Sequence, residues 1–140
     1  MIFAKELTVE TTNTIDDPTV EILKIARGII NWVSIQFPPG CHRLVHCVIL
    51  HHEHQIAPST ESMSLAGDTF PIEWAEYYES YQPPYELKIK VWTEDETYPH
   101  TIDVRVSILP RKAIISLAIV DEIKSLFGML SPKRIFTRGQ

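Results

Sequence analysis

A strict two-residue alternation of apolar and polar side chains is the feature that most constrains this chain. In residues 100–109, HTIDVRVSIL, the alternating apolar positions are Ile102, Val104, Val106 and Ile108. Residues 85–92, YELKIKVW, repeat the pattern. Because successive side chains of a strand point to opposite faces, such a segment buries one face and leaves the other in water. The two segments therefore predict neighbouring strands, joined by the polar loop TEDETYP at 93–99.

Four further segments extend the strand pattern toward the N-terminus: residues 3–10, 20–27, 28–37 and 42–52. The last of these is apolar on both faces. One face carries Val45, Cys47 and Ile49, and the other carries Leu44, His46, Val48 and Leu50. We expect this strand to be covered on both sides, because neither row of side chains suits open water.

Two segments are less regular. Residues 28–37, GIINWVSIQF, stop at the turn Pro38-Pro39-Gly40, and strict alternation places on one face Ile29, Asn31, Val33, Ile35 and Phe37. In residues 67–84, Pro71 excludes a central strand, since proline cannot donate a ladder hydrogen bond. An edge strand or a lid-like loop is expected there, with a short helical turn at 73–79 as the alternative.

The spacing of these segments predicts the fold class. Residues 1–110 hold seven to eight strands separated by turn signals, with almost no helical pattern. The expected fold is all-β, an antiparallel β-sandwich of jelly-roll or immunoglobulin-like topology. Alternation alone does not choose between these strand orders.

The period changes after Pro110. Residues 111–130 predict a C-terminal amphipathic helix, followed by a basic tail at 131–140. The residues that we expect to form an interface on this helix are Ile115, Ile119, Ile123, Leu126 and Phe127. A sandwich buries its inner faces without a helix, and exposing large apolar side chains costs about 1.5–3 kcal/mol each. The stripe must therefore cover an open edge or face of its own domain, or a neighbouring subunit.

Composition narrows the class of protein. The 140 residues suit one folded domain, with 44% hydrophobic residues and a net charge of −5 that disfavours a general nucleic-acid binder. Residues 1–10, MIFAKELTVE, lack the pattern of a signal peptide, so we expect none, and the longest apolar run, 113–120, is too short to span a membrane. Cys41 and Cys47 lie too far apart on one strand to pair. We expect a virion or cytoplasmic location rather than classical secretion.

The fourteen residues CHRLVHCVILHHEH (41–54) hold five of the six histidines. His52 and His54 would share one side of a strand and, with His100, would supply three ligands to a metal ion. The His-x-His pair resembles the first metal motif of the cupin family, but the glutamate of that motif is missing, because the next carboxylate is Glu61. We favour a simpler interpretation, in which His51–His54 form the polar end of a strand, and expect no metal or other cofactor.

No catalytic motif is evident. There is no Gly-x-Ser-x-Gly elbow, no phosphate-binding loop and no activated cysteine, so we expect a non-enzymatic protein. The aromatic residues gather in residues 74–98, and the three with the strongest functional interest are Trp74, Tyr78 and Trp92. Exposed aromatic residues are typical of protein interfaces and of sugar-stacking surfaces. Packing beneath a long loop is the structural alternative.

These observations favour a structural or assembly protein, a sandwich that oligomerises or docks on a larger protein shell. In architecture alone, residues 1–110 resemble the accessory and decoration proteins of tailed-phage capsids. That resemblance implies a virion protein that bridges subunits of the shell. The expected partners are other copies of the same chain, in a homo-oligomer such as a trimer, and a larger protein scaffold. Neither a membrane nor a specific nucleic acid is an expected partner. A carbohydrate- or ligand-binding sandwich is the first alternative, and a cupin-like metal-dependent enzyme is the second.

Overall fold

A computed structural model describes residues 1–110 and 121–126 of the chain. It divides into two compact units, Met1–Ile108 and Leu109–Gln140. The first unit holds all nine strands of the described residues, arranged in two antiparallel sheets. The predicted all-β class is therefore confirmed for this unit.

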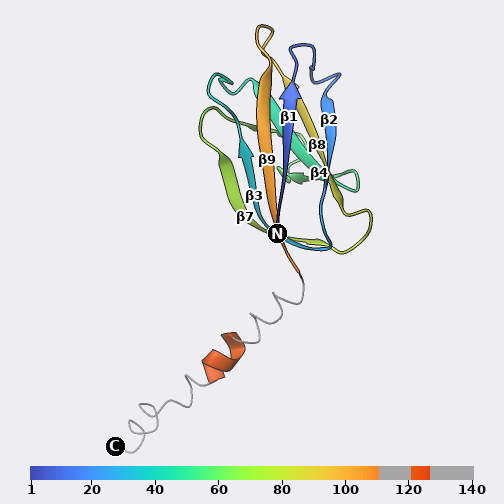
Figure 1. Cartoon of the computed structure of the whole chain (residues 1–140), viewed down its shortest axis with the longest axis vertical. Coiled ribbons are helices and arrows are strands. Elements are labelled where there is room, and N and C mark those ends of the chain that lie inside the picture. Colours follow the sequence, from blue (N-terminus) through green and yellow to red (C-terminus); the bar gives the residue numbers. More distant parts are fainter. Residues whose placement is uncertain (111–120, 127–140) are drawn as a thin grey trace, which may run out of the picture. The chain divides into compact units, whose positions relative to one another are not determined.

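The first sheet has the strand order β1-β9-β3-β7, and the second has the order β2-β8-β4-β5, with β6 paired to β4 (Figure 1). The bounds of the strands are β1 Ile2–Val9, β2 Thr19–Lys24, β3 Gly28–Gln36, β4 Val45–His51, β5 His54–Ala57, β6 Leu65–Ala66, β7 Ile72–Ser80, β8 Glu86–Thr93 and β9 His100–Leu109. The count exceeds the predicted seven to eight because β5 and β6, of four and two residues, lie outside the predicted segments and are too short to show alternation.

The pairing joins the two halves of the chain. The first strand pairs with the last, β2 with β8, β3 with β7 and β4 with β5, all antiparallel. Sequence separation between partners is smallest at the β4–β5 hairpin and largest between Ile2 and Ser107. Strands from the second half of the chain therefore pair with strands from the first half in reverse order.

The inward residues of both sheets form one hydrophobic cluster. The alternation predicted for the last two strands is confirmed, since the buried residues include Leu87, Ile89, Val91, Ile102, Val104, Val106 and Ile108. The prediction for the doubly apolar strand also holds on its inner side, where Val45, Cys47 and Ile49 are buried. On its other side Val48 is buried as well, whereas Leu44, His46 and Leu50 are half-buried.

The inward phase predicted for β3 is wrong at its first half. Ile30 belongs to the core cluster together with Val33, Ile35 and Phe37, although strict alternation placed Ile30 on the opposite face. The pairing with β7 shifts register between Ile30 and Trp32, where the single intervening residue of β3 lies opposite two residues of β7. An irregularity of this kind changes which side chains point inward, and it leaves no mark on the apolar pattern of a segment in which nearly every residue is hydrophobic.

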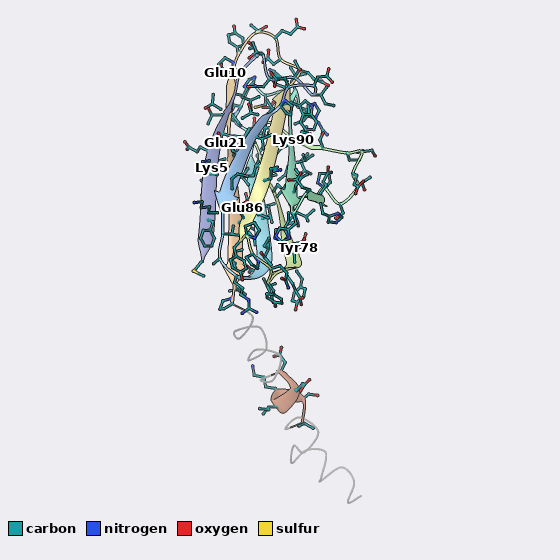
Figure 2. The ribbon with its side chains drawn as sticks, turned by 90° about the vertical axis from the view of Figure 1, so that its right-hand side faces the viewer. Lys5, Glu10, Glu21, Tyr78, Glu86 and Lys90 are labelled. Atoms are coloured by element: carbon teal, nitrogen blue, oxygen red, sulfur yellow. The ribbon has the colours of Figure 1, made fainter. Side chains whose placement is uncertain are left out.

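Strand β7 is the outer strand of its sheet, as Pro71 led us to expect, and the alternative of a helical turn at 73–79 is wrong. Its side chains alternate between half-buried and exposed over nearly the whole strand. At the other side of the domain β1 and β2, the outer strands of the two sheets, lie next to each other (Figure 2). Lys5 and Glu21 form an ion pair of 3.4 Å between them and close this side.

Residues 121–126 are helical and exposed. They are the only part of the predicted helix 111–130 that lies within the described residues. The predicted basic tail 131–140 lies outside them. Among residues 1–110 and 121–126 no helix is long and apolar enough to cross a membrane.

Candidate functional site

The outer face of the β2-β8-β4-β5 sheet carries a cleft of about 450 Å³, which we call the His46–Trp92 cleft. His46 of β4 and Trp92 of β8 are direct partners across neighbouring strands, and both point away from the core. Residues 61–64, within the connection from β5 to β6, form another wall of the cleft. The lining residues are Ile15, His46, Val48, Gln55, Glu61, Ser62, Met63, Ser64, Lys90, Trp92 and Glu94.

His46 is held in one orientation by two contacts. Its ring stacks on Trp92 with centroids 5.4 Å apart and planes inclined by 11°. Its Nδ1 atom lies 2.9 Å from Ser64 Oγ. The other ring nitrogen, Nε2, is buried without a hydrogen-bond partner, and its nearest carboxylate oxygen, on Glu94, lies 3.6 Å away. A buried ring nitrogen without a partner is uncommon in folded proteins and calls for an explanation.

Gln55 fixes the wall of the cleft. Its side-chain amide nitrogen lies 2.8, 3.1 and 3.1 Å from the carbonyl oxygens of Pro58, Thr60 and Met63, which share its two hydrogens. The connection therefore has a defined shape, although it contains neither a helix nor a strand. A second cavity of about 280 Å³ adjoins the cleft and shares Ile15, Trp92 and Glu94 with it.

The charges around the cleft are mixed. Glu61 and Glu94 are exposed carboxylates, whereas Lys90 is half-buried on β8. Figure 2 shows Lys90 and Glu86 along β8. The cleft thus combines a flat aromatic surface with carboxylate, hydroxyl, imidazole and ammonium groups.

The HHEH segment forms a two-residue turn between β4 and β5. His52 and Glu53 have positive φ values of 51° and 63°, a conformation that favours glycine and asparagine. The turn is held against β8, since Glu53 forms an ion pair with Lys88 and the His52 ring contacts the carbonyl oxygen of Pro84 at 3.3 Å. The expectation that this strand ends in polar residues is confirmed for His52–His54, which are exposed.

His51 departs from that expectation, because it is only 5% exposed. Its Nδ1 atom lies 2.9 Å from the Tyr78 hydroxyl, and its Nε2 atom lies 3.5 Å from Ser80 Oγ. These contacts link β4 of one sheet to β7 of the other. Burial lowers the pKa of His51, and the neighbouring His52 lowers it further. Burial also raises the pKa of Tyr78, so this contact forms between two neutral groups at neutral pH.

The structure separates the three histidines of the metal hypothesis. His52 lies in the turn and His54 directly follows it, near the start of β8, whereas His100 begins β9, beyond the other end of β8. His100 Nε2 contacts Asp95 Oδ2 at 2.7 Å. That contact, followed by the backbone amide of Thr97, lowers the pKa of Asp95. Among the residues that the structure describes, no three metal-binding side chains gather.

Both thiols are inside the domain. Cys41 and Cys47 are free and fully buried. Burial raises the pKa of Cys41 to about 11, with a further increase from the charges of Asp68 and Asp95. Burial raises the pKa of Cys47 to about 12. At neutral pH both groups are thiols, the form that does not act as a nucleophile.

The three aromatic residues singled out from the sequence do not form one surface. Trp74 and Tyr78 pack against the core from β7, whereas Trp92 lies on the outer face of the other sheet. Of the proposed interface residues on the helix, Ile123 and Leu126 are 45% and 61% exposed. Ile115, Ile119 and Phe127 lie outside the described residues.

The sequence did not reveal the wall of the cleft. His46 was placed on one face of a doubly apolar strand, but no motif in residues 61–64 indicated that they line a cleft beside it. The one available hint was the number of small polar residues at 59–64, STESMS, next to a strand that needs cover.

No protein-family model matches the chain, and neither a curated protein nor a solved structure matches it.

Proposed function

We propose that this protein is a non-enzymatic assembly protein, a β-sandwich that associates with other copies of itself and docks on a larger protein shell. We further infer that the sandwich is a jelly roll. A jelly roll pairs its eight strands first with last, second with seventh, third with sixth and fourth with fifth. Without the short β6, the pairs β1–β9, β2–β8, β3–β7 and β4–β5 follow that rule.

The observation that carries the assembly proposal is the exposure of Ile123 and Leu126 on the helical segment 121–126. Unit Met1–Ile108 contains its own hydrophobic cluster, so it does not need these side chains to fold. Large apolar side chains kept on a helical turn are typical of a protein interface. A second copy of the same segment offers the same apolar residues, which makes self-association the simplest way to cover them.

The wider role follows from the architecture of the sandwich. Jelly rolls occur in viral capsid proteins and in lectin-like domains, and a fold alone does not define a function. The expected role as an accessory or decoration protein of a tailed-phage capsid, with a trimer bridging shell subunits, stays a proposal. So does a virion or cytoplasmic location.

The molecular mass of the full chain in solution tests the assembly proposal. We expect a multiple of the 16.1 kDa protomer for the natural chain, and a monomer for the double variant Ile123→Asp/Leu126→Asp. The matched control is Lys124→Asp/Ser125→Asp, which introduces two carboxylates into the same helical turn at polar positions and is expected to stay oligomeric. A natural chain that remains monomeric up to about 100 μM would contradict the proposal, because association follows mass action.

A further inference from the structure

We propose that the His46–Trp92 cleft binds one pyranose ring of a neutral saccharide. This inference is independent of the assembly proposal, since it concerns the outer face of the β2-β8-β4-β5 sheet and not the C-terminal segment. At about 450 Å³ the cleft falls in the size range of small-molecule sites, and it remains open to solvent on a half-buried tryptophan.

Trp92 provides the surface for stacking. The other outward residues of β8 are Glu86, Lys88 and Lys90, so an indole in this row is the exception. It lines both the cleft and the adjoining cavity of about 280 Å³. The C–H groups on one face of a pyranose ring are apolar and match a flat aromatic ring. Tryptophan is suited to such a place because one part of it is apolar and another part donates a hydrogen bond.

His46 supplies the second argument. Its Nε2 atom is buried in the wall of the cleft and has no hydrogen-bond partner, although a carboxylate oxygen of Glu94 lies 3.6 Å away, whereas the opposite side of the ring is fixed by Ser64. A sugar hydroxyl both donates and accepts hydrogen bonds, so it satisfies this nitrogen in either tautomer. A ligand without hydroxyl groups leaves the nitrogen unpaired.

The charges select a neutral saccharide. Glu61 and Glu94 accept hydrogen bonds from neighbouring hydroxyls, and Lys90 donates to ring or hydroxyl oxygens. Two carboxylates against one ammonium group, on a chain of net charge −5, disfavour phosphorylated or sulfated sugars. Because Gln55 holds residues 58–64 in place, the site does not need to form on binding.

Nuclear magnetic resonance titration of the isotope-labelled full chain tests the proposal. The probes are methyl glucoside, methyl mannoside, methyl galactoside, N-acetylglucosamine, cellobiose and lactose, with sorbitol as an acyclic polyol and glucose 6-phosphate as an anionic sugar. We expect at least one neutral saccharide to shift the Trp92 indole N–H and the His46 Nε2 resonance saturably, with a dissociation constant of about 0.1–10 mM. Sorbitol and glucose 6-phosphate should bind at least about tenfold more weakly.

Three variants locate the site. Trp92→Ala should weaken binding by about tenfold or more, whereas Tyr77→Ala, which removes an exposed aromatic ring from the other sheet, should leave it unchanged. If Trp92→Ala does not fold, Glu61→Gln/Glu94→Gln provides the test, because both side chains are exposed and their loss should weaken binding without disturbing the core. The proposal is overturned if no neutral saccharide gives a saturable shift, if sorbitol or glucose 6-phosphate binds as well as the best saccharide, or if neither cleft variant weakens binding.

Discussion

Tyr78→Phe removes a single hydroxyl group from the contact that joins the two sheets. In the natural protein this hydroxyl lies 2.9 Å from Nδ1 of His51, a residue that is only 5% exposed. The second nitrogen of His51 has only a long contact of 3.5 Å, to Ser80, which contributes little. The substitution therefore leaves His51 without a good hydrogen-bond partner, while the aromatic ring of residue 78 is kept.

The size of the effect depends on whether water replaces the lost hydroxyl. A buried polar group left without any partner costs about 1–3 kcal/mol. His51 and Tyr78 both line a cavity of about 410 Å³, and this volume is ample for one water molecule. Because a bridging water restores most of a hydrogen bond, we expect a loss of about 1 kcal/mol in the free energy of unfolding.

Urea unfolding at pH 8, followed by tryptophan fluorescence, measures this loss. For a domain of this size about 1 kcal/mol corresponds to a fall of roughly 4–8 °C in the melting temperature, which gives a second readout. The matched control is Tyr77→Phe on the same strand, where the side chain is 61% exposed and a change within about 0.5 kcal/mol is expected. If Tyr78→Phe and Tyr77→Phe were equally stable, the contact between the sheets would not exist in solution. A loss above about 3 kcal/mol would contradict the assumption that water enters.

Three further predictions concern the turn, the histidine and the thiols. Glu53→Gly should stabilise the domain by about 0.5–1 kcal/mol in thermal unfolding, because glycine relieves a positive φ that costs more than an exposed ion pair contributes; a destabilised variant would refute this. The lowered pKa of His51 means that the unfolded chain binds more protons, so the free energy of unfolding should fall as the pH drops through the ordinary histidine range near 6.5. His51→Gln should flatten that dependence, and an unchanged slope would show that other groups cause it. Cys41 and Cys47, whose pKa values are raised to about 11 and 12, should resist iodoacetamide at pH 8 in the folded protein and react in urea; rapid labelling without urea would contradict their burial.

Alternation correctly predicted the inward residues of the strands that have one polar face. Strand β9 and strand β8 have the predicted inward residues, because a charged or polar residue at every second position leaves only one way to place the segment in a core. Strand β3 gave no such constraint. Its first residues are apolar on both faces, so the inward phase was decided by the register shift against β7, a tertiary feature.

The candidate cleft was predictable only in part. The doubly apolar character of residues 42–52 indicated that both faces of this strand are covered, and Trp92 was singled out as an aromatic residue of functional interest. Their proximity depends on β4 pairing with β8, which alternation does not specify. The wall depends on three backbone carbonyls that happen to converge on Gln55, and no residue pattern encodes that convergence.

The pairing of the first strand with the last has a consequence during synthesis on the ribosome. Strand β1 is made first, yet its one strand partner is β9, and the register joins Ile2 to Ser107. Until β9 emerges, β1 has no sheet to join, and β9 also separates it from β3. Among the described strands, the β4–β5 hairpin is the only pair between strands adjacent in the chain, so we expect it to form early and later strands to add around it. Strand β1 therefore stays unpaired until nearly the whole domain has been translated. During that time the charged side chains of Lys5 and Glu6 help to keep it from pairing with other nascent chains.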